Sequence, residues 1–295
     1  MLDLEYLAQL AAEHKDALAA RVQEFSLGGH RFQFNTRPVI MGVINLSADS
    51  WYRESVCLSV DSALQRARVL QAQGAAIVDI GAESTLSHAV RVDELGQKSK
   101  LLPLIKELAA AGQLISAETY NMAVAKACLE AGAKVLNCTS SVLTAEDFRM
   151  VADHDAAVIL CYVEGDNVRE VGEFNLSGDV PQRMREFFAR QIDLATENGL
   201  TKIFIDPGMG FYYRNLQDSA QRVRHQMQTF LNTFRLRTLG FPTCHALPHA
   251  FDYFGEEVRS AEAFFCVLAA MGKTDLFRTH EVPRIRAVLD TMRAF

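Results

Sequence analysis

The amino-acid sequence predicts an α/β protein, a (β/α)8 TIM barrel with a short N-terminal helical and extended extension. From residue 37 onward, short apolar runs alternate with stretches of helical spacing, and eight such pairs follow one another. Most of the runs are apolar at nearly every position, which is typical of parallel strands covered by helices on both faces. Eight strand–helix units are the number that closes such a barrel.

The expected elements follow in strict alternation. The strands are predicted at residues 39–44, 76–81, 114–117, 134–137, 157–161, 203–206, 243–247 and 275–278, and the helices at 61–72, 101–111, 122–130, 145–152, 181–197, 217–236, 259–271 and 282–292. Glycines such as Gly74 and Gly132 stand where helices are expected to stop. An open doubly wound sheet is the alternative, but no Gly-rich phosphate loop follows the first strand.

The first part of the chain is predicted to stand apart from the barrel. Leu4, Leu7 and Leu10 recur near helical spacing, and Phe32 and Phe34 alternate with polar residues as in a strand. We therefore divide the chain into an N-terminal extension, residues 1–36, and a barrel, residues 37–295. No chemistry is expected in the extension.

Composition excludes several classes of partner. The formal net charge of the 295 residues is −6, so the basic footprint of a nucleic-acid-binding protein is missing. No apolar run reaches the roughly 18 residues that a membrane span needs, and the acidic N-terminus is unlike a secretory signal. The six cysteines form no Cys-x-x-Cys pair, which favours buried thiols in a reducing cytoplasm. We expect a cytoplasmic protein that binds neither nucleic acid nor membranes.

Polar side chains gather at the predicted carboxyl ends of the strands. In a barrel these ends meet at one mouth, where active sites are built. The residues at these positions are Asn45, Asp49, Ser50, Asp79, Glu83, Ser84, Thr85, Glu118, Thr119, Asn137, Asp206, Arg278 and His280.

Two kinds of chemistry are expected at this mouth. Glu118, Asn137 and Asp206 offer carboxylates and an amide, which suit a flat heterocycle that presents neighbouring N–H groups. A second set, Asn45, Arg278 and His280, suits an anion such as phosphate or pyrophosphate, with Mg²⁺ as an accompanying cation. Structural alternatives remain open at this stage: Asn137 as a loop cap, Glu118 as a helix-dipole acid and His280 as a helix-start residue.

Five segments, in order, resemble the motifs of dihydropteroate synthases, the pterin-binding (β/α)8 barrels. They are residues 41–50 (MGVINLSADS), 74–85 (GAAIVDIGAEST), 115–120 (ISAETY), 206–211 (DPGMGF) and 278–282 (RTHEV). The family joins a 7,8-dihydropterin pyrophosphate to para-aminobenzoate in folate synthesis and releases pyrophosphate. The resemblance therefore implies a transferase with a small-molecule pterin substrate.

The resemblance also implies roles for particular residues. It places Glu118, Asn137 and Asp206 on the pterin, with Met41 and Phe211, which are equally compatible with the core, as further contacts. Asn45, Asp79, Arg278 and His280 are expected to be catalytic, with Asn45 as the Mg²⁺ ligand. Ser84, Thr85 and His249 are expected on the phosphate and amine side.

The chain departs from the family pattern at several positions. Glu118 stands where the family usually has Asp, Leu86 where it has an Arg, and Ala250 where it has a Lys. Two alternatives therefore accompany the synthase: a pterin-binding paralogue without synthase activity, or a pterin-dependent methyltransferase-like domain. A (β/α)8 enzyme acting on another phosphorylated ring is a third. The helix at 217–236 is long enough to contribute to a homodimer.

Overall fold

The structure, a computed structural model, describes residues 2–47, 52–84, 89–211 and 213–295. Within these residues, eight parallel strands form one sheet in the order β8-β7-β6-β5-β4-β3-β10-β9. The strands are β3 (Val39–Asn45), β4 (Ile77–Gly81), β5 (Ile115–Thr119), β6 (Val135–Cys138), β7 (Ala157–Cys161), β8 (Ile203–Asp206), β9 (Cys244–Ala246) and β10 (Leu276–Thr279). Each begins within two residues of its predicted start.

The sheet closes on itself between β8 and β9. Ile205 and Thr243 form a parallel bridge, and the Ile205 N–H donates to the Pro242 carbonyl at 3.0 Å. β9 has three residues, and its few ladder bonds agree with the weak strand pattern of this segment. The predicted (β/α)8 barrel is confirmed.

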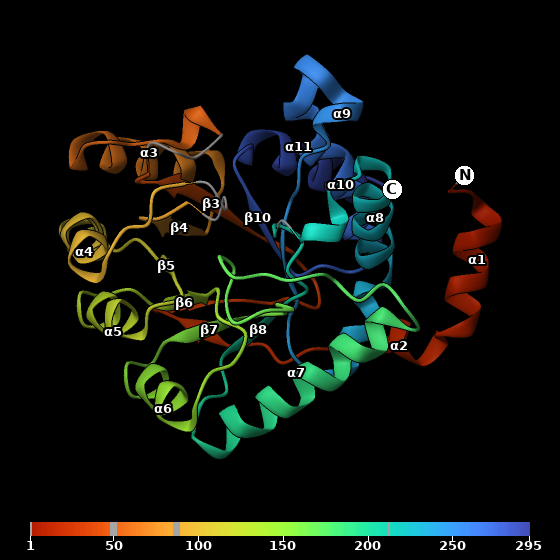
Figure 1. The fold of residues 1–295 in the computed structure, drawn as a ribbon, viewed down its shortest axis with the longest axis horizontal. Helices are drawn as coiled ribbons and strands as arrows, with labels where there is room; N and C mark the ends of the chain where they lie inside the picture. The colour runs from red at the N-terminus through yellow and green to blue at the C-terminus, as the bar shows by residue number, and fades with distance from the viewer. Residues whose placement is uncertain (1, 48–51, 85–88, 212) are drawn as a thin grey trace.

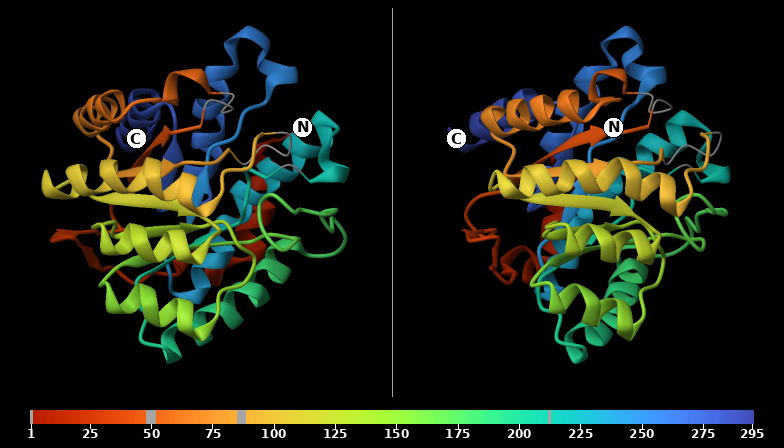
Figure 2. Two further views of the ribbon diagram at one scale, coloured as in Figure 1. Left: turned by 60° about the vertical axis from the view of Figure 1, so that its left-hand side comes forward. Right: turned by 90° about the vertical axis from the view of Figure 1, so that its left-hand side faces the viewer.

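Helices surround the sheet and cover its outer face (Figure 1). They are α3 (Val60–Gln73), α4 (Glu94–Ala110), α5 (Met122–Glu130), α6 (Ala145–Asp153), α7 (Val180–Glu197), α8 (Ser219–Leu236), α10 (Ala261–Met271) and α11 (Val282–Arg293), with a short α9 (Phe251–Phe254) before α10. The turned views in Figure 2 show the helices coloured orange to green stacked in chain order. None of the described helices combines the length and hydropathy of a membrane-spanning segment.

Side-chain caps set the starts of several helices. Ser59 and Thr144 form capping boxes, and Asp93 accepts a bond from the Gly96 N–H at 2.8 Å. The Asp93 cap starts α4 at Glu94, seven residues before the predicted start. The first two turns of α4 are mostly polar, so apolar spacing did not reveal them.

The N-terminal segment closes the amino end of the barrel. After α1 (Leu4–Glu13) and α2 (Lys15–Ala19), a two-stranded hairpin, β1 (Ser26–Leu27) and β2 (His30–Arg31), carries buried phenylalanines on its flanks. Phe25 and Phe34 contact Phe204 of β8 with ring centroids 5.3 and 5.4 Å apart. The strand expected through Phe32 and Phe34 is not formed: β2 ends at Arg31, and both rings beyond it are buried in the cluster inside the barrel.

Candidate active site

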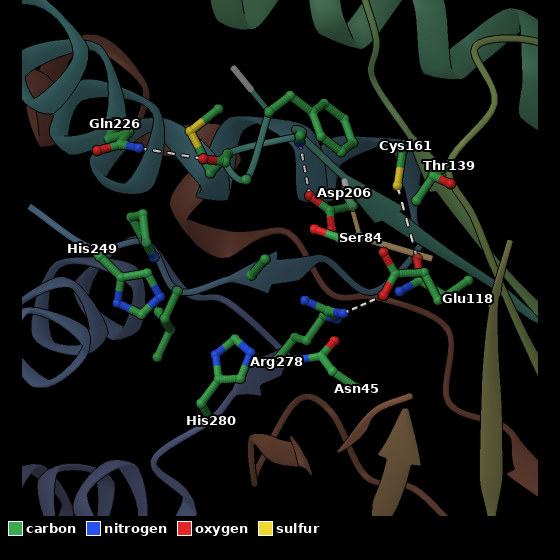
Figure 3. A pocket seen from close by; sticks show the side chains of 18 of the residues that line it. Asn45, Ser84, Glu118, Thr139, Cys161, Asp206, Gln226, His249, Arg278 and His280 are labelled. Carbon is green, nitrogen blue, oxygen red and sulfur yellow. Dashed lines mark hydrogen bonds and ion pairs between the residues drawn. The ribbon is translucent and has the colours of Figure 1, made fainter. Parts of the chain in front are cut away.

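Side chains alternate along each strand, so every second residue points into the barrel. The last inward residues are polar on several strands: Glu118 on β5, Asn137 on β6, Asp206 on β8 and Arg278 on β10. They line a cavity of about 130 Å³ at the carboxyl ends of the strands (Figure 3). The convergence that the sequence predicts at one mouth is therefore present for these four residues.

Arg278 binds two acids on neighbouring strands. Its Nε donates to Asp79 Oδ2 at 2.7 Å, and its Nη2 donates to Glu118 Oε2 at 2.5 Å. The Asn137 amide donates to the same Asp79 oxygen at 3.2 Å. Asp79 is fully buried and is not among the residues that line the cavity. Among the described residues, Arg278 Nη1 makes no hydrogen bond, so its N–H groups are available to an anion.

Burial dominates the protonation behaviour of the two cavity acids. It raises the pKa of Glu118, although the charge of Arg278 opposes the shift. Burial also raises the pKa of Asp206 to about 7, although the Gly208 N–H and Arg278 oppose it. Acids with raised pKa values in a cavity are common at functional sites.

The loop after β8 is shaped around Asp206. Asp206 Oδ1 accepts the Gly208 N–H at 2.8 Å. Gly208 has φ +77°, and a Cβ there would lie 2.3 Å from the Tyr162 carbonyl oxygen, so only glycine fits. The same loop carries Phe211 to the cavity wall, as the sequence predicts.

Met41 does not reach the cavity. It lies on the inward face of β3 four residues before Asn45, is fully buried, and packs with the apolar side chains inside the barrel. Met41 therefore serves the core, in place of the pterin contact that the sequence predicts. Asn45, at the end of the same strand, does line the cavity, and its amide nitrogen donates to Ser55 Oγ at 2.6 Å.

Two histidines form another edge of the cavity. His249 and His280 both line it, and Glu262 of α10 lies behind them with no exposed surface. The distance from Glu262 Oε1 is 3.2 Å to His280 Nδ1 and 3.7 Å to His249 Nε2. Burial lowers the pKa of His249 to about 3, although Glu262 opposes this shift. Burial alone would raise the pKa of Glu262, but the hydrogen bond and charge of His280, with smaller contributions from His249 and Thr279, together hold that pKa below its usual range.

The remaining predicted residues divide clearly. Ser84 lines the cavity, whereas Thr85 and Leu86 lie outside the described residues. Ala250 is 2% exposed and is not among the lining residues, whereas His249, Leu247 and Pro248 of the same loop do line the cavity.

Several residues at the cavity were missed from the sequence. Arg222 and Gln226 of α8 line it, and Gln226 donates to the Met209 carbonyl at 3.3 Å. Both residues lie on a helix. A search for polar residues at the carboxyl ends of predicted strands therefore does not find them. Glu262 had a usable signal, because it is the sole charge in the helix sequence AEAFFCVLAAM. A lone acid in an apolar helix needs a buried partner.

Comparison with known proteins identifies relatives. A family model described as "Pterin binding enzyme" matches residues 41–280. The dihydropteroate synthase of Streptococcus pyogenes is 30% identical over 216 residues, which cover 72% of this chain and 75% of that protein. The dihydropteroate synthase of Synechocystis sp. is 28% identical over 87% of this chain and 89% of its own length.

Solved structures share the fold. Dihydropteroate synthase from Xanthomonas albilineans, solved with 4-aminobenzoic acid, has a TM-score of 0.76 and 25% identity, covering 92% of this chain and 97% of that one. The enzyme from Burkholderia cenocepacia, complexed with 7,8-dihydropteroate, has a TM-score of 0.77 over 92% of this chain and 96% of its own. At 23% identity, the second match bears on the fold alone. With a family model spanning most of its barrel and relatives matched over most of their length, this chain belongs to the pterin-binding enzyme family of the dihydropteroate synthases.

Proposed function

We propose that this protein is a dihydropteroate synthase, a transferase of folate biosynthesis. It joins a 7,8-dihydropterin pyrophosphate to para-aminobenzoate or a related amine and releases pyrophosphate. Besides family membership, one observation carries the proposal: Asp206, Asn137 and Glu118 line the same cavity at the mouth of the barrel.

Asp206 is the proposed anchor of the pterin ring. A pterin presents an amino group and a ring N–H side by side, and a carboxylate can accept both. One lone pair of Oδ1 is taken by the Gly208 N–H, which fixes the direction of the carboxylate. Burial raises the pKa of Asp206 to about 7, so the free protein holds both the neutral and the ionised form near neutral pH. Hydrogen bonds from the ring N–H donors favour the ionised form when the pterin binds.

The bond changes follow from this placement. The bond between the pterin methylene carbon and the pyrophosphate oxygen breaks, and its electron pair leaves with pyrophosphate. The amine nitrogen of aminobenzoate attacks the methylene carbon, forms the new C–N bond and then loses a proton. Positive charge on the ring during this exchange is stabilised by the nearby carboxylates of Asp206 and Glu118.

The leaving pyrophosphate needs cations. Arg278 Nη1 and His280 face the cavity and are the proposed partners of its oxygens. Asp79 is proposed to position Arg278, because its buried carboxylate holds the guanidinium Nε at 2.7 Å. Ser84 and His249 are proposed on the phosphate and amine side of the same cavity.

Mg²⁺ is proposed as the accompanying metal. Ser55 holds the amide nitrogen of Asn45, which assigns the Asn45 carbonyl oxygen to the cavity side. Mg²⁺ prefers oxygen ligands and commonly takes few from the protein and the rest from phosphate and water, so this residue fits it. When bound, the ion would neutralise charge on the pyrophosphate.

The runner-up is pterin binding without transfer. Two observations favour it: Arg278 is already paired with two acids, and Ala250 brings no charge to the position where the family carries a Lys. An assay of pyrophosphate release from 6-hydroxymethyl-7,8-dihydropterin pyrophosphate and para-aminobenzoate separates the two. Release above the uncatalysed rate supports the synthase. No release of pyrophosphate, combined with pterin binding in calorimetry, supports the runner-up. Failure to bind any pterin contradicts both the synthase and the runner-up.

Cellular setting and assembly complete the proposal. All six cysteines are buried free thiols, in accord with a reducing cytoplasm.

We also propose that two copies pair through α10, because its Phe264, Val267 and Met271 are 39%, 37% and 43% exposed along one helical face.

A further inference from the structure

The cluster of His249, Glu262 and His280 has the composition of a transition-metal site. One ligand atom from each of the three residues lies within 4.8 Å of the others. Two imidazoles and one carboxylate form a donor set that favours Zn²⁺, Fe²⁺ and similar ions over Mg²⁺, which prefers oxygen alone. The three residues come from separate parts of the chain: the loop after β9, the first turn of α10 and the end of β10.

We propose that His249, Glu262 and His280 bind a divalent transition metal of the zinc class at the edge of the cavity. The two distances from the carboxylate to the imidazoles suit such an ion. Around a tetrahedral Zn²⁺ with bonds of about 2.0–2.2 Å, ligand atoms lie roughly 3.3–3.6 Å apart. Glu262 Oε1 lies 3.2 Å from His280 Nδ1 and 3.7 Å from His249 Nε2, close to that spacing on both sides.

Neighbouring groups hold the carboxylate of Glu262 in place. Thr279 Oγ1 donates to Oε2, and the His280 backbone N–H lies 3.3 Å from the same oxygen. The same N–H lies 3.5 Å from Oε1, which is also the oxygen that faces both imidazoles. Tyr52 stacks on the His280 ring with centroids 4.5 Å apart, which fixes the plane of that imidazole. Such outer contacts typically orient metal ligands and strengthen binding.

The position of the three ligands leaves the metal open toward the cavity. His249 and His280 line the cavity, and Glu262 approaches from the helix behind them. Figure 3 shows both histidines on the opposite side of Arg278 from Glu118. Three protein ligands and one open position are the arrangement of a metal that meets a substrate. Metal binding at His280 Nδ1 requires that nitrogen to carry no proton, so a neutral imidazole would hold its proton on Nε2 and a doubly protonated one would release a proton to solvent.

The site has a clear use in the reaction. The sequence lacks two cations of the family near the ligand, since Leu86 stands in place of an Arg beside the phosphate and Ala250 in place of a Lys that contacts the pterin. A dication held by His249, Glu262 and His280 would add positive charge on the side where pyrophosphate leaves, partly offset by the carboxylate of Glu262. This use rests on the proposed synthase function, whereas metal binding itself does not depend on it.

Direct titration tests the site. The full-length protein, prepared without a polyhistidine tag and stripped with a chelator, is titrated with Zn²⁺ by calorimetry and with Co²⁺ by visible absorption, with Mg²⁺ as the comparison ion. We expect one equivalent of Zn²⁺ with a Kd below about 1 µM. Glu262→Gln and His249→Ala should each weaken binding by at least about 100-fold, since even losing an outer partner of a ligand costs 10–100-fold. His154→Ala, on a histidine at the end of α6 that bonds to Met150, is the matched control and should bind as the wild type does.

The outcomes separate the site from the function. No stoichiometric Zn²⁺ uptake, or equal uptake by folded Glu262→Gln and His249→Ala, overturns the site. Circular dichroism checks folding, and His249→Ala decides if Glu262→Gln is unfolded. Pyrophosphate should bind at least tenfold more tightly to the Zn²⁺-loaded protein than to the stripped protein, and equal affinity removes the link to pyrophosphate. A protein that binds Zn²⁺ but no pterin retains the site and contradicts the synthase.

Discussion

Replacing Asp206 by Asn removes the charge that is proposed to hold the pterin while leaving the loop around it intact. The amide oxygen can still accept the Gly208 N–H that Oδ1 accepts now at 2.8 Å. Its NH2 group would then face the N–H donors of the pterin. Two charge-assisted hydrogen bonds are lost, each worth about 1.5–3 kcal/mol. The expected loss of roughly 3–6 kcal/mol corresponds to a Kd raised about 10²–10⁴-fold.

The pH dependence of binding gives a second signature. Wild-type Asp206 has a pKa raised to about 7, so it must lose a proton to accept two N–H bonds at lower pH. Affinity for 6-hydroxymethylpterin should therefore fall roughly tenfold for each pH unit below 7. Calorimetry from pH 5.5 to pH 8 should show this slope in the wild type and a flat profile in Asp206→Asn.

Asp206→Asn is expected to raise the stability of the fold while it lowers the affinity for the pterin. The pKa of Asp206 is raised from 3.8 to about 7, so the contribution of the neutral acid is fully present below pH 3.8 and is lost as the pH rises through 7. Asn stays neutral, so the variant should melt at a higher temperature than the wild type above pH 7. The exposed Asp193→Asn is the matched control and should change neither property. Unchanged pterin affinity in Asp206→Asn would refute the assignment of this residue to the site.

Three further substitutions test other parts of the structure. Arg278→Met leaves Asp79 and Glu118 as buried acids without their cation, so urea unfolding should show a loss of about 3–5 kcal/mol; a loss below 1 kcal/mol would contradict the network. Phe34→Ala opens a cavity at the amino end of the barrel and should cost about 3–5 kcal/mol, with pterin Kd unchanged in the folded protein. Val267→Glu should convert a dimer to a monomer in sedimentation, and an unaltered sedimentation coefficient would exclude α10 as the interface.

The fold was predictable because local and global signals agree in it. Most strands are apolar runs with polar residues at or just after their ends, and most helices have apolar spacing beside a cap or a glycine. Asp206, Glu118 and Asn137 could be placed for the same reason, since the carboxyl ends of parallel strands must share one edge. Boundaries were less accurate where packing does not shape the sequence, as in the polar start of α4.

Other parts of the site depend on contacts that spacing does not encode. Met41 lies on the inward face of β3, but only the depth of the residue along the barrel axis shows that it belongs to the core. Arg278 was expected beside an anion, and its pairing with Asp79 and Glu118 follows from the reach of a long side chain on β10 past β3 to β4 and β5. Glu262 enters from a helix, so its meeting with His249 and His280 required the fold itself.

The aromatic plug formed by Phe25, Phe32 and Phe34 links the order of synthesis to the order of assembly. These rings leave the ribosome first, yet their partner Phe204 is made much later. Until then the N-terminal segment exposes apolar side chains that lack their packing partner. Packing this segment against β8 closes a long loop, which has a large entropic cost. Early folding is therefore expected to depend on contacts between neighbouring strand–helix pairs. The N-terminal segment is expected to pack against the amino end of the barrel last.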